Sequence, residues 1–166
     1  MCSQQSPAPA DSRRTLLAAV SRVAENGLFA FADPSDQAAF DGVGVSAAGG
    51  GWLRARVRFT GLVQGQLVLT VPEALARGLC AAFAGVESAD PIRDADLIDF
   101  SGELANMVCG GWLSAASPQG TFALMPPQVV RGGPARAETD GRRPLETFYV
   151  AINDRPVRLE VECSAG

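Results

Sequence analysis

The most restrictive feature of this sequence is a change in the spacing of its apolar residues that begins at Leu53. In the stretch LRARVRF, residues 53–59, apolar side chains alternate with arginines, and a period of two is typical of a strand with one buried face. The segment GLVQG, 61–65, then turns the chain, and QLVLTV, 66–71, returns as a second strand. The pattern therefore predicts a β-hairpin.

The arginines of the first strand, Arg54, Arg56 and Arg58, share its polar face. Such a row is either a solvated face that blunts pairing with another chain or an anion-binding site. We favour the first interpretation, with the arginines on a strand at the edge of the sheet.

Helical spacing of apolar residues surrounds this hairpin. A helix is expected to begin near Asp11 or Ser12, either of which could cap it, and to stop at Asn26-Gly27. Further helices are expected after Pro72, with Gly85 as the terminator, and over roughly 93–116. The turn-rich stretch 31–51 is predicted to be a long loop with at most a short strand.

The remaining segments predict further strands. Residues 120–130 read as a strand interrupted by a proline pair, 131–143 as a polar loop, and the C-terminal end as a hairpin around the turn 153–156. This order predicts an α+β fold, a mostly antiparallel sheet with long helices packed on one face. Residues 1–10 are expected to be a disordered N-terminal tail, and 11–166 a single domain.

Composition excludes several classes of function. The formal net charge is −4, which argues against a nucleic-acid partner. All 14 basic residues are arginines and there is no histidine, so mechanisms that need a histidine base or a catalytic lysine are excluded. The 4 cysteines show no paired spacing, which disfavours a metal site. With no secretory leader and no membrane-spanning run, we expect a cytoplasmic protein with reduced thiols and no membrane association.

The predicted helix 93–116 carries a polar seam. At 100° per residue, Leu97, Leu104, Val108, Gly111 and Ala115 share the side expected to face the sheet. Four other residues fall within about one fifth of the circumference on the opposite side. They are Asp99, Glu103, Asn106 and Gly110.

The residues of this seam allow two interpretations. It is either an ordinary solvated face or a functional surface, where Gly110 would let a partner approach closely beside Asn106. Glycine at 102, 110 and 111 weakens the helix by roughly 1 kcal/mol each relative to alanine, which is unexpected in a purely structural helix. The Gly110-Gly111 pair could also let this helix pack tightly against another.

The order D-x-x-x-E-x-x-N, from Asp99 to Asn106, resembles the active helix of the CheC/CheX family of chemotaxis phosphatases. The continuation NMVCGGW is similar to the run that follows in CheX-type members, and 60–85 resembles the family's hairpin and alanine-rich helix. Pro126-Pro127 falls where the family places a proline, although 20 residues after Asn106 is a shorter gap than the family pattern. A second E-x-x-N is lacking, so a single-site, CheX-like protein is the nearer match.

This resemblance implies a phosphatase that acts on the aspartyl-phosphate of a CheY-like response-regulator receiver domain. Asn106 would hold the attacking water and Glu103 would pair with the receiver's lysine, whereas Asp99 either contacts the partner or supports the helix. Gly110, Pro126 and Pro127 would belong to the partner-binding surface. The chain itself would bind no cofactor or metal, because Mg²⁺ is expected on the partner receiver.

Two other functions stay open at this point. The first is a non-catalytic CheX-like module that binds a receiver or a flagellar or signalling partner, which the altered proline spacing favours. The second is an unrelated α+β structural protein whose seam is ordinary surface. The terminal hairpin could also extend the sheet across a homodimer.

Overall fold

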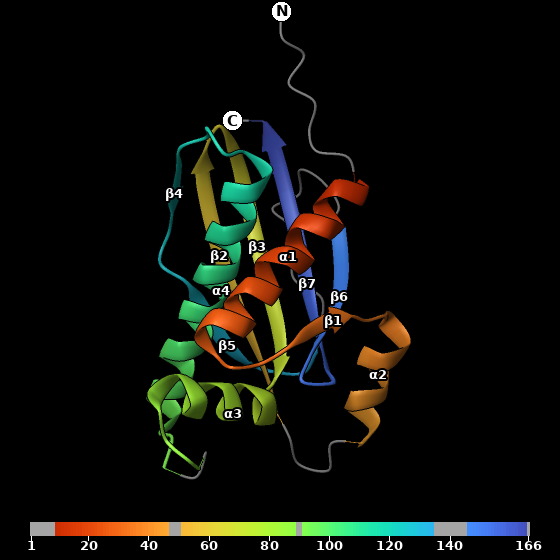
Figure 1. Cartoon of the computed structure of the whole chain (residues 1–166), viewed down its shortest axis with the longest axis vertical. Helices are drawn as coiled ribbons and strands as arrows, with labels where there is room; N and C mark the ends of the chain where they lie inside the picture. The colour runs from red at the N-terminus through yellow and green to blue at the C-terminus, as the bar shows by residue number, and fades with distance from the viewer. Residues whose placement is uncertain (1–8, 47–50, 89–90, 135–145, 166) are drawn as a thin grey trace, which may run out of the picture.

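The computed structural model describes residues 9–46, 51–88, 91–134 and 146–165, which form four helices and seven strands. Figure 1 shows the sheet with the long helices in front of it. The helices are α1 Pro9–Gly27, α2 Gln37–Ser46, α3 Glu73–Ala84 and α4 Asp94–Ala116. The strands are β1 Ala32–Pro34, β2 Trp52–Gly61, β3 Val63–Pro72, β4 Phe122–Leu124, β5 Gln128–Gly132, β6 Glu146–Ile152 and β7 Arg155–Ala165.

The seven strands form one antiparallel sheet in the order β1-β6-β7-β3-β2-β4, with β5 also paired to β2. Helices α1 and α4 run across one face of this sheet, and α3 crosses near one end (Figure 1). The predicted α+β class is therefore confirmed. The core cluster of buried residues draws on α1, α3, α4 and the strands behind them.

The predicted hairpin is confirmed, and its register explains the buried face. Leu53 lies opposite Val71 and Val57 opposite Leu67, and all four side chains belong to the core. Residues directly opposite each other in an antiparallel pair point to the same face. The alternation in the sequence thus builds the platform on which α1 and α4 pack.

The prediction that the arginine row lies on an edge strand is wrong. Strand β2 is internal, because it pairs with β3 on one side and with β4 and β5 on the other. Arg54 and Arg56 are half-buried, and only Arg58 is exposed. The row therefore belongs to the polar face of the sheet, opposite α1 and α4.

That polar face contains buried charge. Gln66, Arg158, Glu160 and Glu162 are all less than a tenth exposed. Gln66 Nε2 donates to Glu162 Oε2 over 2.9 Å, and Arg158 pairs with Glu160 at 3.3 Å. Buried ionisable groups need partners of this kind, because an unpaired charge away from water is costly.

Helix α2 was not expected, because its segment was predicted to be loop. Its buried residue Phe40 contacts the Trp52 and Tyr149 rings, at centroid separations of 4.8 and 5.6 Å, and lies 5.0 Å from the Arg158 guanidinium carbon. These contacts place α2 on the polar face. Packing of this one aromatic side chain therefore stabilises a helix whose own sequence is poor in helix formers.

The ends of α1 and of the C-terminal hairpin differ slightly from expectation. Helix α1 begins at Pro9 rather than at Asp11 or Ser12, which suits the tolerance of a first helical turn for proline. The predicted terminal turn is confirmed and uses Asn153 and Asp154, both at positive φ. Of the predicted N-terminal tail, residues 1–8 lie outside the described part of the chain, as does most of the loop predicted over 131–143.

The homodimer stays a prediction. Strand β7 is internal, between β3 and β6, so only β6 could extend the sheet from the terminal hairpin. Over the described residues, 146–148 pair with β7 alone.

Candidate functional site

Helix α4 confirms the predicted helix 93–116 to within a residue and is buried over most of its circumference. Asp94 and Asp96 lie in its first turn, where carboxylates interact favourably with the helix dipole. Gly111 is half-buried and Ala115 exposed, unlike the other residues expected to face the sheet. The buried residues are Leu97, Phe100, Ser101, Gly102, Leu104, Ala105, Val108, Cys109, Trp112 and Leu113.

The remaining face of α4 is the exposed strip, defined by Asp99, Glu103, Asn106 and Gly110. Asp99 and Glu103 are exposed, whereas Asn106 and Gly110 are half-buried. On one flank lies α1, and a Cβ built on Gly111 would be 3.6 Å from Ala19 Cβ. This is an ordinary van der Waals distance, so the tight packing predicted for the glycine pair is not required at Gly111. The strip lies open beside α1.

On the other flank, the chain between β4 and β5 forms a wall along the helix, here called the 124–127 wall. A Cβ on Gly102 would lie 2.8 Å from Pro127 Cγ, and one on Gly110 would lie 3.8 Å from Leu124 Cδ1. Residues four apart on a helix share a row, so Asn106 sits midway between these two glycines, beside the wall. Gly102 therefore has a structural reason to be glycine that was not evident from the sequence.

The Asn106 amide is held in this row without a hydrogen bond. Its Oδ1 is buried and has no partner, and Asn106 makes no side-chain hydrogen bond to the described residues. The wall offers few donors, because Pro126 and Pro127 lack N–H groups and the Met125 N–H donates to Arg58 O at 2.8 Å. An unpaired buried carbonyl oxygen costs about 1–3 kcal/mol, and the amide stays free to bind an external group.

The four carboxylates of α4 differ in whether they have a partner among the described residues. Asp94 pairs with Arg77 at 2.7 Å and with Arg131 at 2.8 Å, and Asp96 forms two hydrogen bonds with Arg93. Asp99 and Glu103 have no ion pair or side-chain hydrogen bond within the described residues.

These contacts bear on Asp99, for which the sequence left two roles open. Among the described residues, Asp99 has no hydrogen bond or ion pair through which it would support the helix. The strip therefore presents two free carboxylates and one free amide on a rigid helix, which suits recognition of a partner surface that carries positive charge.

A comparison with protein families identifies the family of this chain. The family model described as "Chemotaxis phosphatase CheX" matches residues 53–150, which include the hairpin, α3, α4 and the 124–127 wall. The chain belongs to the CheX family. Among curated proteins, no sequence matches the chain.

Solved structures share the fold of this CheX-family chain. The chemotaxis protein CheX from Vibrio vulnificus superposes with a TM-score of 0.71 at 19% identity, over 96% of this chain and 100% of that one. A CheX from Desulfovibrio desulfuricans gives 0.71 at 20% identity, over 93% and 99%. The CheX of a CheX–CheY–BeF3–Mg complex from Borrelia burgdorferi gives 0.60 at 13% identity, over 90% and 96%. At these identities the likeness shows the fold.

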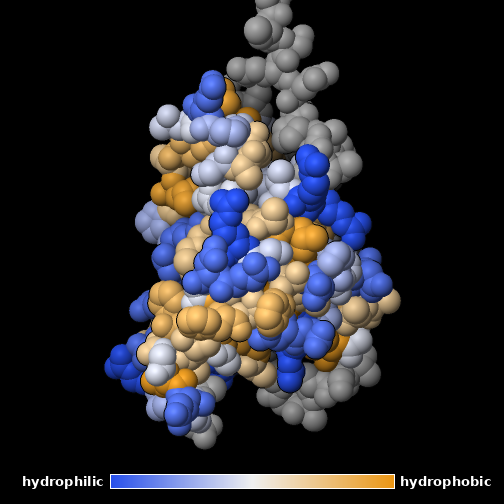
Figure 2. Space-filling model, viewed as in Figure 1, coloured by the Kyte–Doolittle hydropathy of each residue, from blue (hydrophilic) through white to orange (hydrophobic). Residues whose placement is uncertain are grey.

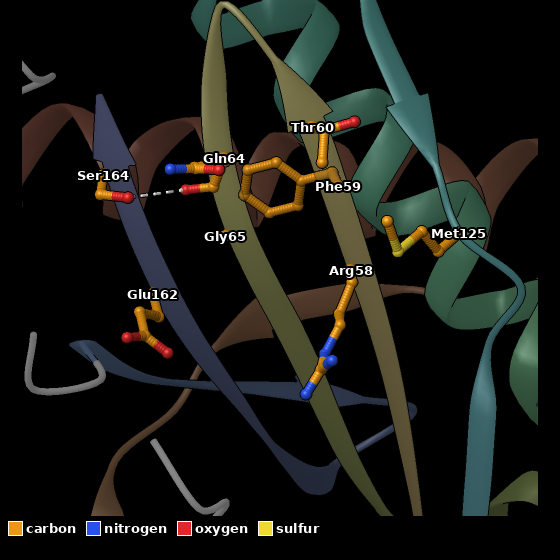
Figure 3. Close-up of a pocket in the computed structure, with 8 residues that line it drawn as sticks. All are labelled: Arg58, Phe59, Thr60, Gln64, Gly65, Met125, Glu162 and Ser164. Carbon is orange, nitrogen blue, oxygen red and sulfur yellow. Dashed lines mark hydrogen bonds between the residues drawn. The ribbon is translucent and has the colours of Figure 1, made fainter. Parts of the chain in front are cut away.

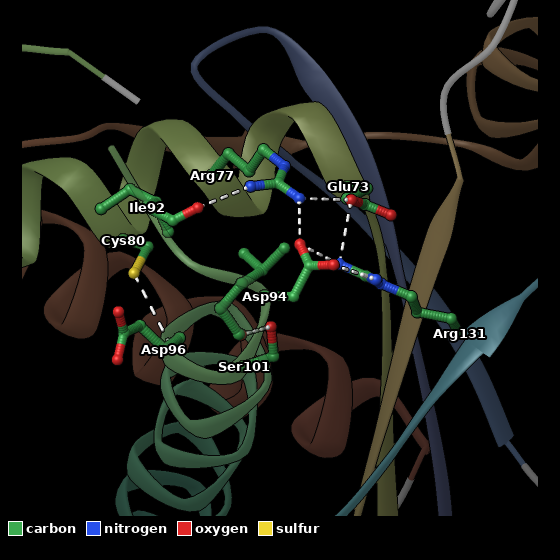
Figure 4. A network of polar contacts seen from close by, with 9 residues as sticks. Glu73, Arg77, Cys80, Ile92, Asp94, Asp96, Ser101 and Arg131 are labelled. Atoms are coloured by element: carbon green, nitrogen blue, oxygen red, sulfur yellow. Dashed lines mark hydrogen bonds and ion pairs between the residues drawn. The ribbon is translucent and has the colours of Figure 1, made fainter. Parts of the chain in front are cut away.

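An ion network fixes the start of α4 to its neighbours (Figure 4). Arg77 of α3 and Arg131 of β5 both contact Asp94, and both also reach Glu73 Oε1, at 3.0 and 3.3 Å. Arg77 donates in addition to the Ile92 carbonyl oxygen at 3.0 Å. Hydrogen bonds from Arg131 and Arg77 hold the pKa of Asp94 well below its ordinary value. The network joins α3, α4 and β5, and no sequence pattern indicated it.

The predicted partner-binding residues lie along the same surface. Pro127 is half-buried and lies against Gly102, and Pro126 is exposed in the 124–127 wall. Gly110 lies one turn of α4 after Asn106, on the same side of the helix. Leu124 was not predicted. Leu124 is exposed and lies beside Gly110. The two positions are 14 residues apart in the chain, so no local sequence pattern indicates that they are neighbours.

A hollow of about 440 Å³ lies at the polar face of the sheet (Figure 3). Its lining includes Arg58, Gln64 and Glu162, with Ser164 Oγ donating to the Gln64 carbonyl oxygen at 3.4 Å. Arg58 projects away from the face on which Phe59 meets α4, so this hollow is separate from the exposed strip.

The cysteine on α4 has no role in the chemistry of the strip. Cys109 is fully buried, and burial raises the pKa of its thiol to about 12. A thiol with such a pKa stays protonated and unreactive at neutral pH, so Cys109 serves as a small buried residue of the core. Trp52 and Trp112 are also buried, Trp112 in the core cluster and Trp52 against Phe40.

Two further expectations concern ions and membranes. Among the described residues, no three His, Cys, Asp or Glu side chains gather closely enough to hold a metal ion. In the same part of the chain, none of the helices combines the length and apolar character that crossing a bilayer requires.

Proposed function

We propose that this protein is a phosphatase for the aspartyl-phosphate of a CheY-like response-regulator receiver domain. Membership of the CheX family supports the reaction class, and the complex of a structurally similar CheX with CheY, BeF3 and Mg supports the kind of partner. The observation that carries the proposal is that the Asn106 amide and the neighbouring Glu103 carboxylate have no hydrogen bond or ion pair with the described residues.

The chemistry required is the in-line attack of a water molecule on phosphorus. The receiver contributes Mg²⁺ and a lysine, which neutralise charge on the transferring group, and lacks only a well-placed water. An amide can accept a hydrogen bond from that water through its oxygen or donate to it through its nitrogen. Oδ1 is buried, and no hydrogen bond to the described residues fixes the Asn106 side chain, so rotation of the amide would bring either atom to the water.

Glu103 has a different task in this proposal. It is exposed and unpaired, one turn of helix before Asn106, so it can form an ion pair with the receiver's lysine. The pair would fix the register of the two proteins without proton transfer. Catalysis by positioning can contribute several kcal/mol to lowering the barrier, and it needs neither histidine nor lysine in this chain.

A decay assay tests the proposal. Receiver domains from the same organism are phosphorylated with acetyl phosphate in the presence of Mg²⁺, and loss of phosphate is followed with and without this protein. Wild type should accelerate the loss from at least one receiver, and Asn106→Ala should abolish the acceleration while the protein remains folded. Glu103→Gln should weaken docking and raise KM.

Two results would overturn the proposal. One is the absence of any acceleration by wild type across all receivers of the organism. The other is binding without hydrolysis that Asn106→Ala leaves unchanged, which would select the non-catalytic binding module instead.

A further inference from the structure

Packing against the described residues does not require glycine at position 110. A Cβ at this position would meet Leu124 Cδ1 at 3.8 Å, an ordinary van der Waals distance, whereas a Cβ at Gly102 would collide with Pro127. Alanine would thus fit at 110, and alanine is the more stable residue in a helix interior. A requirement from outside the described fold, such as close approach of another molecule, would account for glycine there.

Leu124 is an apolar side chain exposed beside this opening. It is 38% exposed and lies opposite Phe59, whose ring meets Trp112 of α4. Leu124 therefore projects toward the helix side of the sheet. Val130 of β5 lies opposite Arg54 and projects to the polar face, so it is exposed on the other side of the molecule.

We infer that Gly110 and Leu124 form a docking notch for an apolar side chain of the phosphorylated receiver. Leu124 supplies the apolar contact, and the missing side chain at Gly110 lets the receiver approach α4 closely. This inference rests on the proposed function and identifies a contact that sets affinity rather than chemistry.

The position of the docking notch specifies where its partner group lies. Gly110 is four residues beyond Asn106, a distance of about 6 Å along the helix axis. The apolar group of the receiver therefore meets α4 about one helical turn beyond the position from which Asn106 reaches the phosphoryl group. The docking notch adjoins the exposed strip at Gly110. One surface of the receiver can therefore contact the carboxylates of Asp99 and Glu103 and the apolar side chain of Leu124 at the same time.

Two variants and two matched controls test the inference. Leu124→Ala removes the apolar contact, and Gly110→Ala fills the notch. Val130→Ala also shortens an exposed apolar side chain, by two carbons where Leu124→Ala removes three, at a position that is 50% exposed on the other face. Gly78→Ala adds a methyl group to α3, where a Cβ would meet nothing within 4 Å. The substrate is the phosphorylated receiver that wild type dephosphorylates fastest, and affinity is measured by calorimetry with the same receiver activated by beryllofluoride.

Leu124→Ala and Gly110→Ala should each raise KM and Kd about tenfold and leave kcat unchanged, because they weaken docking and leave Asn106 in place. Gly110→Ala should also keep or raise the melting temperature, which a damaged fold would not do. Both controls should match wild type in KM. If KM and Kd of both test variants equal those of the controls while wild type is active, the docking notch is refuted and the phosphatase stands. If wild type acts on no receiver, both proposals fail.

Discussion

At the scale of single residues, Asn106 combines two properties that stability alone would select against. It is a poor helix-interior residue, and its buried Oδ1 lacks a hydrogen bond. Both costs disappear in an alanine variant, which would leave only a small unfilled space beside the 124–127 wall. Such a conflict between local stability and the residue present is expected at functional positions.

Asn106→Ala should therefore unfold at higher denaturant concentration than wild type. Removing an unpaired polar atom and a poor helix former is expected to raise the free energy of unfolding by about 1–2 kcal/mol. Urea unfolding followed by circular dichroism measures the difference. Asn106→Asp serves as the contrasting variant, since it keeps the shape but adds a charge beside a buried site, and it should be less stable than wild type. A less stable Asn106→Ala protein would show that the amide contributes to the fold.

Gly102 represents the opposite case, in which a glycine is required by internal packing. A Cβ there would press on Pro127 Cγ at 2.8 Å and on Pro127 Cβ at 3.2 Å, both atoms of a rigid ring. Gly102→Ala should lower the free energy of unfolding by about 1–3 kcal/mol in spite of its better helix propensity. The double variant with Pro127→Ala should recover part of the loss, since the two changes act on one contact. Strictly additive losses in this double-mutant cycle would contradict the assigned contact.

At the scale of elements, the ion network around Asp94 connects α3, α4 and β5. Asp94 is 60% exposed and Arg131 38%, so the ion pair between them contributes little by itself. Glu73 and Arg77 are less exposed. The joint effect of the network is geometric, because Arg131 anchors the end of β5 and thereby the strand that continues from the 124–127 wall. Stability of this region therefore depends on the charge of Asp94.

Acid should lower the free energy of unfolding, because protonation of Asp94 removes its ion pairs with Arg77 and Arg131. The folded-state pKa of Asp94 lies below its ordinary value near 3.8, chiefly because Arg131 and then Arg77 donate hydrogen bonds to it. A depressed carboxylate pKa stabilises the folded state above the ordinary pKa, and this contribution is lost as pH falls below about 4. Urea unfolding between pH 5 and 2 should show a shallower loss of stability for Asp94→Asn than for wild type. Asp99→Asn removes an α4 carboxylate that makes no ion pair with the described residues, so it should leave the contribution of the Asp94 network to this slope unchanged.

At the scale of the whole molecule, the sequence predicted what depends on local periodicity. The hairpin, α3, α4 and the exposed strip follow from spacings of two and 3.6, because one face of each element is buried. Helix α2 could not be predicted, since its stability comes from Phe40 contacts with rings in β2 and β6. The internal position of β2 could not be predicted either. An internal strand with one polar face and an edge strand show the same alternation of apolar and charged residues.

The site was predictable only in part. Helical geometry placed Glu103 and Asn106 on one side of α4, and family resemblance supplied their proposed roles. The unpartnered state of the amide, the role of Gly102 and the exposure of Leu124 all depend on the 124–127 wall. That wall meets α4 through contacts between residues 14 to 25 positions apart, such as Gly102 with Pro127, which no local pattern encodes.

The charge of the whole molecule bears on how it meets its partner. The formal net charge is −4, and attraction to the positive charge proposed on the receiver's docking surface depends on where the exposed carboxylates lie. Asp99 and Glu103 face solvent, and the screening length falls from about 14 Å at 50 mM salt to about 4 Å at 500 mM. Raising salt over this range should therefore increase KM severalfold and leave kcat unchanged.

Asp99→Asn should flatten this salt dependence, because one of the two attracting carboxylates is removed. Asp154→Asn provides the matched control: it changes net charge by the same unit but lies exposed at the β6–β7 turn, in the half of the sheet away from β4 and β5. If the local arrangement of charge governs docking, only Asp99→Asn alters the slope of log KM against log salt concentration. Equal slopes for the two variants would mean that net charge alone matters and that Asp99 takes no part in recognition.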